Sequence, residues 1–245
     1  MRYGILVDHT KCITCEACTV HCRELNEPPG QLKYTRVKRI AGGSFPRVFA
    51  YSVKSACMHC AEATCTLVCP SGAMHKTPEG AVVTNPDRCI GCNYCAANCP
   101  FQVPQFLKSS GKAYKCTFCA PRLVAGQVPW CADACLTGAI KFGKRADMVA
   151  EGTRRVNALK QAGVAKAQLY GESQLGGLSV LTVLRDDPAV YGLAARPRVP
   201  AGAVLWRYLT KPLGGVAVAG AAAVVALNWM VSRRMQAGAA KEGKV

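Results

Sequence analysis

Residues 89–100 read CIGCNYCAANCP, with four cysteines separated by two, two and three residues and a proline after the last one. Residues 57–70, CMHCAEATCTLVCP, repeat this pattern with two extra residues before the third cysteine. Residues 12–22, CITCEACTVHC, repeat it without the proline. All sixteen cysteines of the chain fall into four sets of four: Cys12, Cys15, Cys18, Cys22; Cys57, Cys60, Cys65, Cys69; Cys89, Cys92, Cys95, Cys99; and Cys116, Cys119, Cys131, Cys135.

This spacing is typical of bacterial ferredoxins, in which cysteine thiolates bind [4Fe–4S] clusters. Three thiolates on a tight loop bind three irons of one cluster. The fourth, which we expect to begin a helix that leads away, binds the other cluster of a two-cluster unit. A disulfide framework is disfavoured, because we expect no signal peptide in the residues before Cys12. Zinc ribbons usually present two C-x-x-C pairs, and no C-x-x-C here is followed by the histidine needed for haem attachment.

The same rule predicts which thiols share a cluster. The second and third sets are close in sequence and form one two-cluster unit, so the first and fourth sets form the other. The predicted ligand sets are site A, Cys57, Cys60, Cys65 and Cys99; site B, Cys89, Cys92, Cys95 and Cys69; site C, Cys12, Cys15, Cys18 and Cys135; and site D, Cys116, Cys119, Cys131 and Cys22. We expect the histidines nearby to be structural: His9, His21, His59 and His75.

The chain of 245 residues carries a formal net charge of +17, which favours acidic partners such as nucleic acid, anionic lipid or an acidic prosthetic group. An oxidised cluster with four thiolates has a net charge of −2, so four clusters would leave roughly +9. Lys11, Arg88 and Lys115 directly precede three of the cysteine sets. They are either solvated charges beside anionic loops or cations that tune cluster potentials.

The predicted fold is α+β, with one ferredoxin-like unit (residues 57–99) inserted into another (residues 1–56 and 100–145). We expect strands at residues 3–8, 80–84 and 139–142, and a hairpin arm that includes residues 32–40. Residues 146–200 form a helix–strand extension and linker. The helix is expected at residues 146–162, with Met148, Val149, Val156 and Leu159 on one side. The strand is expected at residues 178–184, and the proline-bearing linker at residues 195–201.

A transmembrane helix is predicted within residues 204–234, followed by a tail at residues 235–245. Residues 213–231 contain Asn228 as their one polar residue and would span about 28 Å as a helix, enough for a bilayer core. The expected aromatic and basic edges are Trp206, Arg207, Tyr208, Lys211, Trp229, Arg233 and Arg234. Gly215, Ala219 and Ala223 favour close packing on a helix of a partner subunit. A buried alanine-rich helix of a soluble protein is the alternative.

The chain resembles the electron-transfer β subunits of molybdopterin oxidoreductases and of some hydrogenases. It is most similar to the β subunit of membrane-bound formate dehydrogenase. The residues that carry the resemblance include 114–119 (YKCTFC), 126–131 (GQVPWC), 137–143 (TGAIKFG), 169–171 (LYG), 176–177 (GG), 186–188 (DDP) and 191–193 (YGL). Leu136 departs from the usual proline. Cys92 stands where nitrate reductase relatives have tryptophan and a three-iron cluster, so the resemblance implies four full [4Fe–4S] clusters.

The resemblance implies a non-catalytic subunit, and we find no catalytic residue in the sequence. Electrons would pass from a formate-oxidising subunit with a molybdenum- or tungsten-pterin, through the clusters, to a membrane cytochrome b subunit and quinone. One C-terminal helix would anchor the protein in the bilayer with the cluster domain on the periplasmic face; a cytoplasmic face also fits. The same role in a hydrogenase or a sulfur-compound or sulfoxide reductase is the alternative. A zinc-binding nucleic-acid module is more remote, and we expect no nucleic-acid partner.

Overall fold

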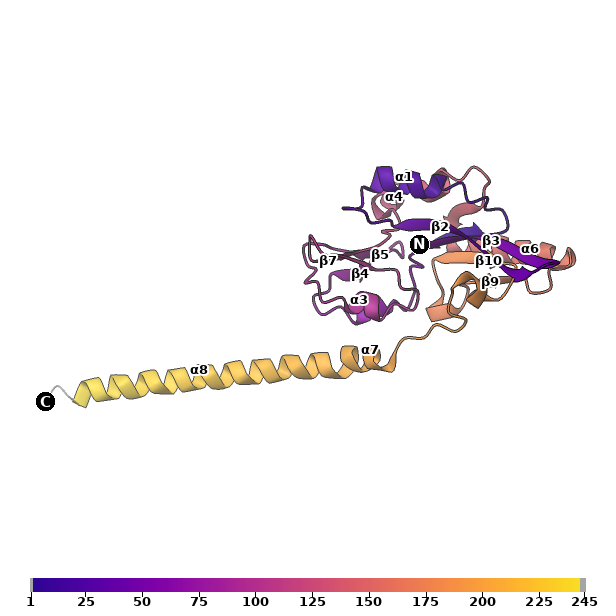
Figure 1. The fold of residues 1–245 in the computed structure, drawn as a ribbon. Coiled ribbons are helices and arrows are strands. Elements are labelled where there is room, and N and C mark those ends of the chain that lie inside the picture. The colour runs from indigo at the N-terminus through magenta and orange to yellow at the C-terminus, as the bar shows by residue number, and fades with distance from the viewer. Residues whose placement is uncertain (1, 243–245) are drawn as a thin grey trace. The chain divides into compact units, whose positions relative to one another are not determined.

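The computed structural model describes residues 2–242, including their side chains except those of Lys211 and residues 234–242. The chain divides after Pro200 into two compact units, which are described separately below. The first unit is a mixed α+β fold, as predicted, and the second is helical (Figure 1).

The first unit contains many short elements joined by loops. Its strands are β1 (Tyr3–Asp8), β2 (Thr35–Ser44), β3 (Arg47–Ala56), β4 (Met74–Lys76), β5 (Val82–Thr84), β6 (Gln105–Leu107), β7 (Lys112–Tyr114), β8 (Ile140–Lys144), β9 (Gln168–Tyr170) and β10 (Val180–Leu184). Its helices are α1 (Ala17–Asn26), α2 (Thr64–Leu67), α3 (Tyr94–Ala97), α4 (Ala120–Val124), α5 (Trp130–Asp133) and α6 (Arg145–Gln161), with 3₁₀ turns η1 (Gln174–Gly176) and η2 (Pro188–Tyr191).

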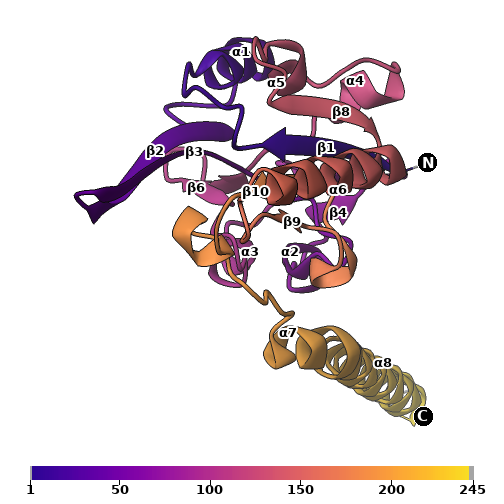
Figure 2. The same cartoon turned by 90° about the vertical axis from the view of Figure 1, so that its right-hand side faces the viewer.

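A four-stranded sheet in the order β8-β1-β10-β9 organises this unit. Strand β1 lies parallel to β10, with Ile5 opposite Val180, and antiparallel to β8. Side chains alternate across the sheet, so Leu6, Leu181 and neighbouring residues face α6 and pack on its Val156 and Leu159. Helix α6 therefore covers one face of the sheet, as Figure 2 shows.

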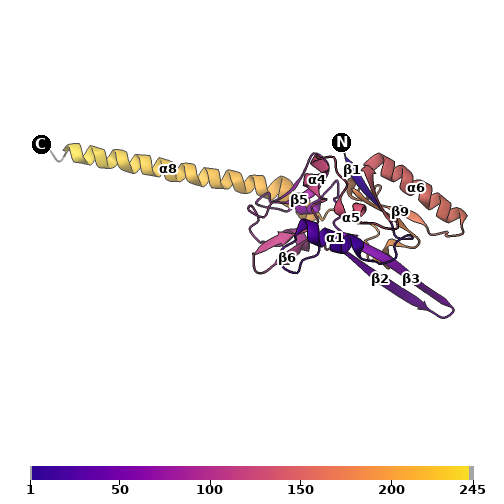
Figure 3. The same cartoon turned by 90° about the horizontal axis from the view of Figure 1, so that it is seen from above.

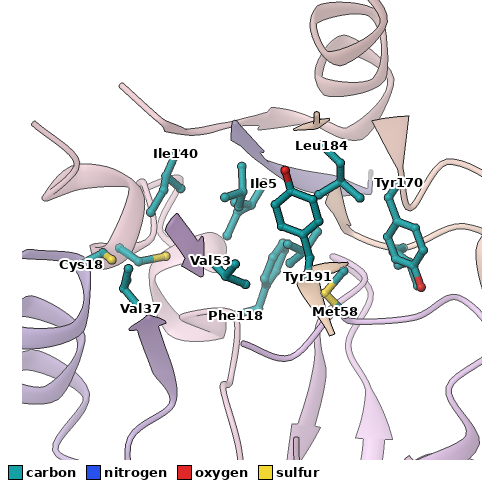
Figure 4. Close-up of a cluster of buried hydrophobic side chains, with 14 of the residues drawn as sticks. Ile5, Cys18, Val37, Val53, Met58, Phe118, Ile140, Tyr170, Leu184 and Tyr191 are labelled. Atoms are coloured by element: carbon teal, nitrogen blue, oxygen red, sulfur yellow. The ribbon is translucent and has the colours of Figure 1, made fainter. Parts of the chain in front are cut away.

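The other face of the sheet carries the main core, to which Ile5 and Leu184 contribute (Figure 4). Phe118 from the fourth cysteine loop and Tyr191 from η2 lie in the same core. Cys18 of site C is also part of it. Residues of the first and fourth cysteine sets thus pack on the face of the sheet opposite α6.

Two-stranded hairpins connect the cysteine sets. Strands β2 and β3 pair from Thr35–Ala56 at the root to Ser44–Arg47 at the tip, and β4–β5 and β6–β7 form shorter pairs. The β2–β3 hairpin extends outward from the rest of the unit (Figure 3). Its root is buried through Thr35, Val37 and Val53, whereas Phe45 at the tip is exposed.

Most of the predicted elements are present with shifted ends. The strand expected at residues 80–84 covers only Val82–Thr84, because Gly80 adopts a positive φ of 90° in the turn before it. The helix expected at residues 146–162 begins at Arg145 and ends at Gln161, with Val156 and Leu159 buried. The boundaries of the outer and inserted units stay a prediction. Residues 146–200 supply β9 and β10 to the sheet that contains β1, and they include most of α6, which packs on that sheet.

The second unit contains α7 (Ala201–Leu205), a π-helical turn η3 (Trp206–Thr210) and α8 (Lys211–Glu242). Residues Ala201–Arg233 are continuously helical over 33 residues and have a mean hydropathy of 1.8 in their most apolar stretch. This helix is long and apolar enough to cross a bilayer. It includes the predicted span at residues 213–231.

Candidate iron–sulfur centres

All four cysteine loops contain the same backbone turn. The residue before the second cysteine has a positive φ in each loop: Thr14 (59°), His59 (47°), Gly91 (74°) and Phe118 (60°). Left-handed conformations are uncommon for residues other than glycine, so their recurrence at one position marks a shared structural requirement. Successive backbone N–H groups in such turns form concave sites that suit anionic groups. Sequence reasoning missed this feature, for which Gly91 was the one local signal.

The helices begin near the third cysteine of each set, which corrects the prediction that the fourth cysteine begins a helix. Cys18 lies in α1, Cys65 in α2, Cys95 in α3 and Cys131 in α5. A four-residue step within a helix advances about 6 Å along the axis. Only α1 is long enough to include its fourth cysteine, Cys22, whereas α2, α3 and α5 each end two residues before theirs.

Three small cavities are lined by the thiols of predicted sites A, C and D. The first is lined by Cys57, Cys60, Cys65 and Cys99. The second is lined by Cys12, Cys15, Cys18 and Cys135. The third is lined by Cys22, Cys116, Cys119 and Cys131, and also by Cys57. In each case cysteines from distant parts of the chain share one cavity.

The thiols of site B gather at the other end of the fold, in a small core that includes Cys69, Cys89 and Cys95. The pKa of Cys95 is raised to about 11, mainly by burial and in part by the nearby thiol groups of Cys89, Cys92 and Cys69. Cys65 of site A packs against this core. Sites A and B are therefore neighbours.

Backbone amides donate hydrogen bonds to cysteine sulfurs in corresponding places. Met74 N donates to Cys69 Sγ at 3.4 Å, and Ile140 N donates to Cys135 Sγ at 3.3 Å, each from the residue five positions on. Phe118 N donates to Cys116 Sγ at 3.4 Å and Ala113 N to Cys89 Sγ at 3.5 Å. Such bonds stabilise thiolates and are one of the factors that set cluster potentials.

Asn26 contacts two predicted ligands of site D. Its Nδ2 donates to Cys22 Sγ at 3.4 Å, and its Oδ1 lies 3.6 Å from Cys119 Sγ. Cys22 belongs to the first set and Cys119 to the fourth. The side chain of Asn26 therefore joins the two sets that were predicted to share this site, a role that the sequence did not indicate.

The electrostatics of the thiols fit metal ligation. Burial raises the pKa of Cys18 to about 11 and the pKa of Cys22 to about 12. It also raises the pKa of Cys60 and Cys116. Buried thiolates at this density require positive charge, and bound iron supplies it.

The spacing of the thiols fits a cluster better than a single ion. Within residues 2–242, no group of three or more His, Cys, Asp and Glu side chains is gathered closely enough to hold one metal ion. Four thiolates at about 2.3 Å from one zinc would lie about 3.8 Å from each other. Because the thiols are not gathered as closely as one ion requires, they fit the larger cubic cluster better than a single zinc.

The basic residues and histidines near the cysteine sets differ in burial. Lys115 is buried, and its Nζ donates to Val82 O and, at 3.1 Å, to Cys116 O; Lys11 and Arg88 are exposed. His59 is fully buried, and its Nδ1 accepts a hydrogen bond from Val82 N at 2.9 Å. The ring of His9 stacks on that of Tyr191, with centroids 5.4 Å apart. These contacts fit the structural role expected for both histidines.

Comparison with known proteins agrees with this arrangement. The family model described as a 4Fe-4S dicluster domain matches residues 48–145. The formate dehydrogenase iron-sulfur subunit of Haemophilus influenzae is 35% identical over 238 residues, which cover 89% of this chain and 76% of that protein. The formate dehydrogenase-O iron-sulfur subunit of Escherichia coli K12 is 36% identical over 234 residues, covering 87% and 78%. The B subunit of the anaerobic dimethyl sulfoxide reductase of Escherichia coli K12 is 37% identical over 150 residues, covering 58% and 73%.

The identity extends over most of this chain and over more than two thirds of the formate dehydrogenase subunits. The matched dicluster domain includes twelve of the sixteen cysteines, since only the first set lies before residue 48. The chain therefore belongs to the family of iron–sulfur subunits of formate dehydrogenases and related reductases, and it is an iron–sulfur electron-transfer protein of that family.

Proposed function

We propose that this chain carries four [4Fe–4S] clusters and relays electrons from a molybdenum- or tungsten-pterin subunit that oxidises formate to a membrane cytochrome b subunit and quinone. The observation that carries the proposal is the gathering of the predicted ligands of sites A, C and D in three cavities, and of three thiols of site B in one small core. A [4Fe–4S] cluster supplies one-electron redox chemistry when bound. The chain itself supplies thiolates, amide donors and an apolar surrounding that excludes water.

The predicted ligand sets are supported by which thiols lie together. Sites A, C and D each correspond to one cavity with the expected four cysteines. Site B corresponds to the small core with Cys69, Cys89 and Cys95. We therefore keep the assignment of Cys99 to site A, Cys69 to site B, Cys135 to site C and Cys22 to site D.

The contacts between groups favour a linear order C–D–A–B. Cys18 of site C has Cys131 of site D among the groups that affect its charge. Cys57 of site A also lines the cavity of site D. Cys65 of site A packs against the thiols of site B. Each group thus adjoins the next one in this order, as a relay requires.

The length and mean hydropathy of the helix Ala201–Arg233 support anchoring in a bilayer. We propose that it crosses the membrane once, with the cluster unit on the periplasmic face, and packs on a helix of the cytochrome b subunit through Gly215, Ala219 and Ala223. The orientation follows from the family resemblance, because basic residues flank both ends of the span.

Formate is favoured as the source of electrons by the extent of similarity. The formate dehydrogenase subunits match 87–89% of this chain, whereas the dimethyl sulfoxide reductase subunit matches 58%. The same relay in a sulfoxide reductase or a hydrogenase is the second candidate.

The test uses the detergent-solubilised complex, purified without oxygen from its native membrane. We expect about sixteen iron atoms per chain. We also expect formate to reduce the clusters, which electron paramagnetic resonance would detect. If dithionite reduces the clusters and formate does not, the proposed relay role stands and formate is rejected as the electron donor. Hydrogen would then be tested as the donor. A colourless protein that contains zinc would reject iron–sulfur chemistry altogether.

A further inference from the structure

Lys54 lies between two of the predicted cluster sites. It is a half-buried residue of β3, three positions before Cys57. Its side chain lines the cavity of site C and also the cavity of site D. Among the residues that the structure describes, it is the lysine common to both cavities.

The root of the β2–β3 hairpin holds Lys54 in this place. Val37 pairs with Lys54 across the hairpin and lines the cavity of site C. Thr35 and Ala56 pair two residues further toward the root and line the cavity of site D. The paired backbone fixes the wall between the two sites, so the position of the lysine does not depend on a mobile loop.

The ammonium group of Lys54 is available to the clusters. Its Nζ makes no hydrogen bond to another side chain or backbone group within the described part of the chain, in contrast to Lys115, whose Nζ donates to Val82 O and Cys116 O. Lys54 lines the cavity of site C together with Cys18, and the cavity of site D together with Cys22, Cys116 and Cys131.

A cation at this place has a direct effect on reduction. Reduction adds one negative charge to a cluster site that is already anionic, and two such sites side by side repel each other. A positive charge between them stabilises the reduced form of each. It also lowers the electrostatic cost of having both sites reduced at the same time.

We propose that Lys54 is the shared counter-cation of sites C and D, and that its charge raises the reduction potentials of both sites relative to A and B. The inference rests on the proposed function, because it takes [4Fe–4S] clusters to bind at the two sites. Lys54 acts on the two sites through its positive charge and is not an iron ligand.

The experiment is an anaerobic redox titration of the intact complex, with mediators and dithionite, followed by electron paramagnetic resonance. Lys54→Met keeps an unbranched side chain that is one atom shorter and removes the ammonium group with its charge, so we expect two of the four midpoint potentials to fall and two to stay. Lys54→Arg keeps the charge and is expected to retain all four. Lys38→Gln is the matched control: Lys38 is an exposed lysine of the same hairpin that does not line either cavity.

Unchanged midpoints in Lys54→Met with full iron content would overturn the proposal, as would an equal shift in Lys38→Gln. If Lys54→Met loses iron, Lys54→Arg distinguishes a charge role from a steric role. A charge role predicts normal iron content and normal midpoint potentials in Lys54→Arg. Loss of iron in that variant as well indicates a steric role and refutes the proposal. The titration does not use formate. A wrong assignment of the electron donor would therefore leave this result unchanged, whereas failure of the lysine role would leave the relay intact.

Discussion

Gly91 is the residue whose replacement tests the cysteine-loop geometry most directly. It lies between Cys89 and Cys92 with a φ of +74°, and a Cβ at this position would come closer than 3.0 Å to Gly111 O. Gly111 belongs to the turn between β6 and β7, and Ala113 N in β7 donates to Cys89 Sγ at 3.5 Å. Gly91→Ala must therefore push this hairpin away from the loop and weaken an amide–sulfur bond at site B.

The expected magnitude has two parts. A left-handed conformation costs a residue with a Cβ about 1–2 kcal/mol. Forcing an extra carbon into a filled space costs about 1–3 kcal/mol more. The control is Gly163→Ala at the end of α6, where φ is +85° and no atom lies within 4 Å of the added Cβ. That variant carries the first cost alone, about 1–2 kcal/mol.

The assay is thermal bleaching of the cluster absorbance of the intact complex without oxygen, together with iron content. At about 2–4 °C per kcal/mol, Gly163→Ala lowers the bleaching temperature by about 2–8 °C with normal iron. We expect Gly91→Ala to lower it by about 4–20 °C and to lose the iron of one cluster. If Gly91→Ala keeps all its iron and matches Gly163→Ala, the inferred fit between the loop and the hairpin is wrong.

Three further predictions follow from the same contacts. Cys99→Ser is expected to perturb the cluster of Cys57, Cys60 and Cys65 in electron paramagnetic resonance, and Cys69→Ser that of Cys89, Cys92 and Cys95; the reverse result would exclude the proposed ligand sets. Burial, assisted by the charge of Lys54, lowers the pKa of His9 from 6.5 to about 4. Because the unfolded chain takes up this proton first, stability is expected to fall as the pH drops below 6.5, by up to about 1.4 kcal/mol per unit and about 3 kcal/mol in total. Denaturation of His9→Phe between pH 7.5 and 5.5 (about one unit either side of the ordinary histidine value) should show a flatter dependence, and an unchanged slope would contradict this origin. A chain that ends at Pro200 is expected to leave the membrane fraction with its iron bound; continued membrane association would show that residues 201–245 are not the only attachment.

The cysteine pattern was informative because it reports local geometry. Spacings of two residues between cysteines require a tight loop, and a spacing of three residues between the third and fourth requires about one helical turn. Both depend on neighbouring residues alone, so they can be read from the sequence. The error about where the helices begin was also local: the third cysteine, rather than the fourth, lies at the start of the helix.

Several features of the site were outside the reach of this reasoning. Nothing in the residues around Lys54 indicates that it separates two cluster sites, because the pairing of β2 with β3 and the return of Cys135 and Cys22 to the hairpin root decide this. The positive φ of Thr14, His59 and Phe118 was equally hidden, since these residue types have no strong preference for that conformation.

The sequence by itself determined the iron–sulfur type of cofactor and the presence of a long apolar C-terminal helix, and it predicted four groups of ligands, because these follow from local spacing and composition. Only the tertiary structure decided that β10 lies beside β1, with Val180 opposite Ile5. It also showed that the start of β10 contacts the second cysteine loop: Met58 O accepts hydrogen bonds from Ser179 N at 3.1 Å and Val180 N at 3.2 Å. Contacts between residues so far apart depend on how the whole protein closes around its core, which no short stretch of sequence specifies.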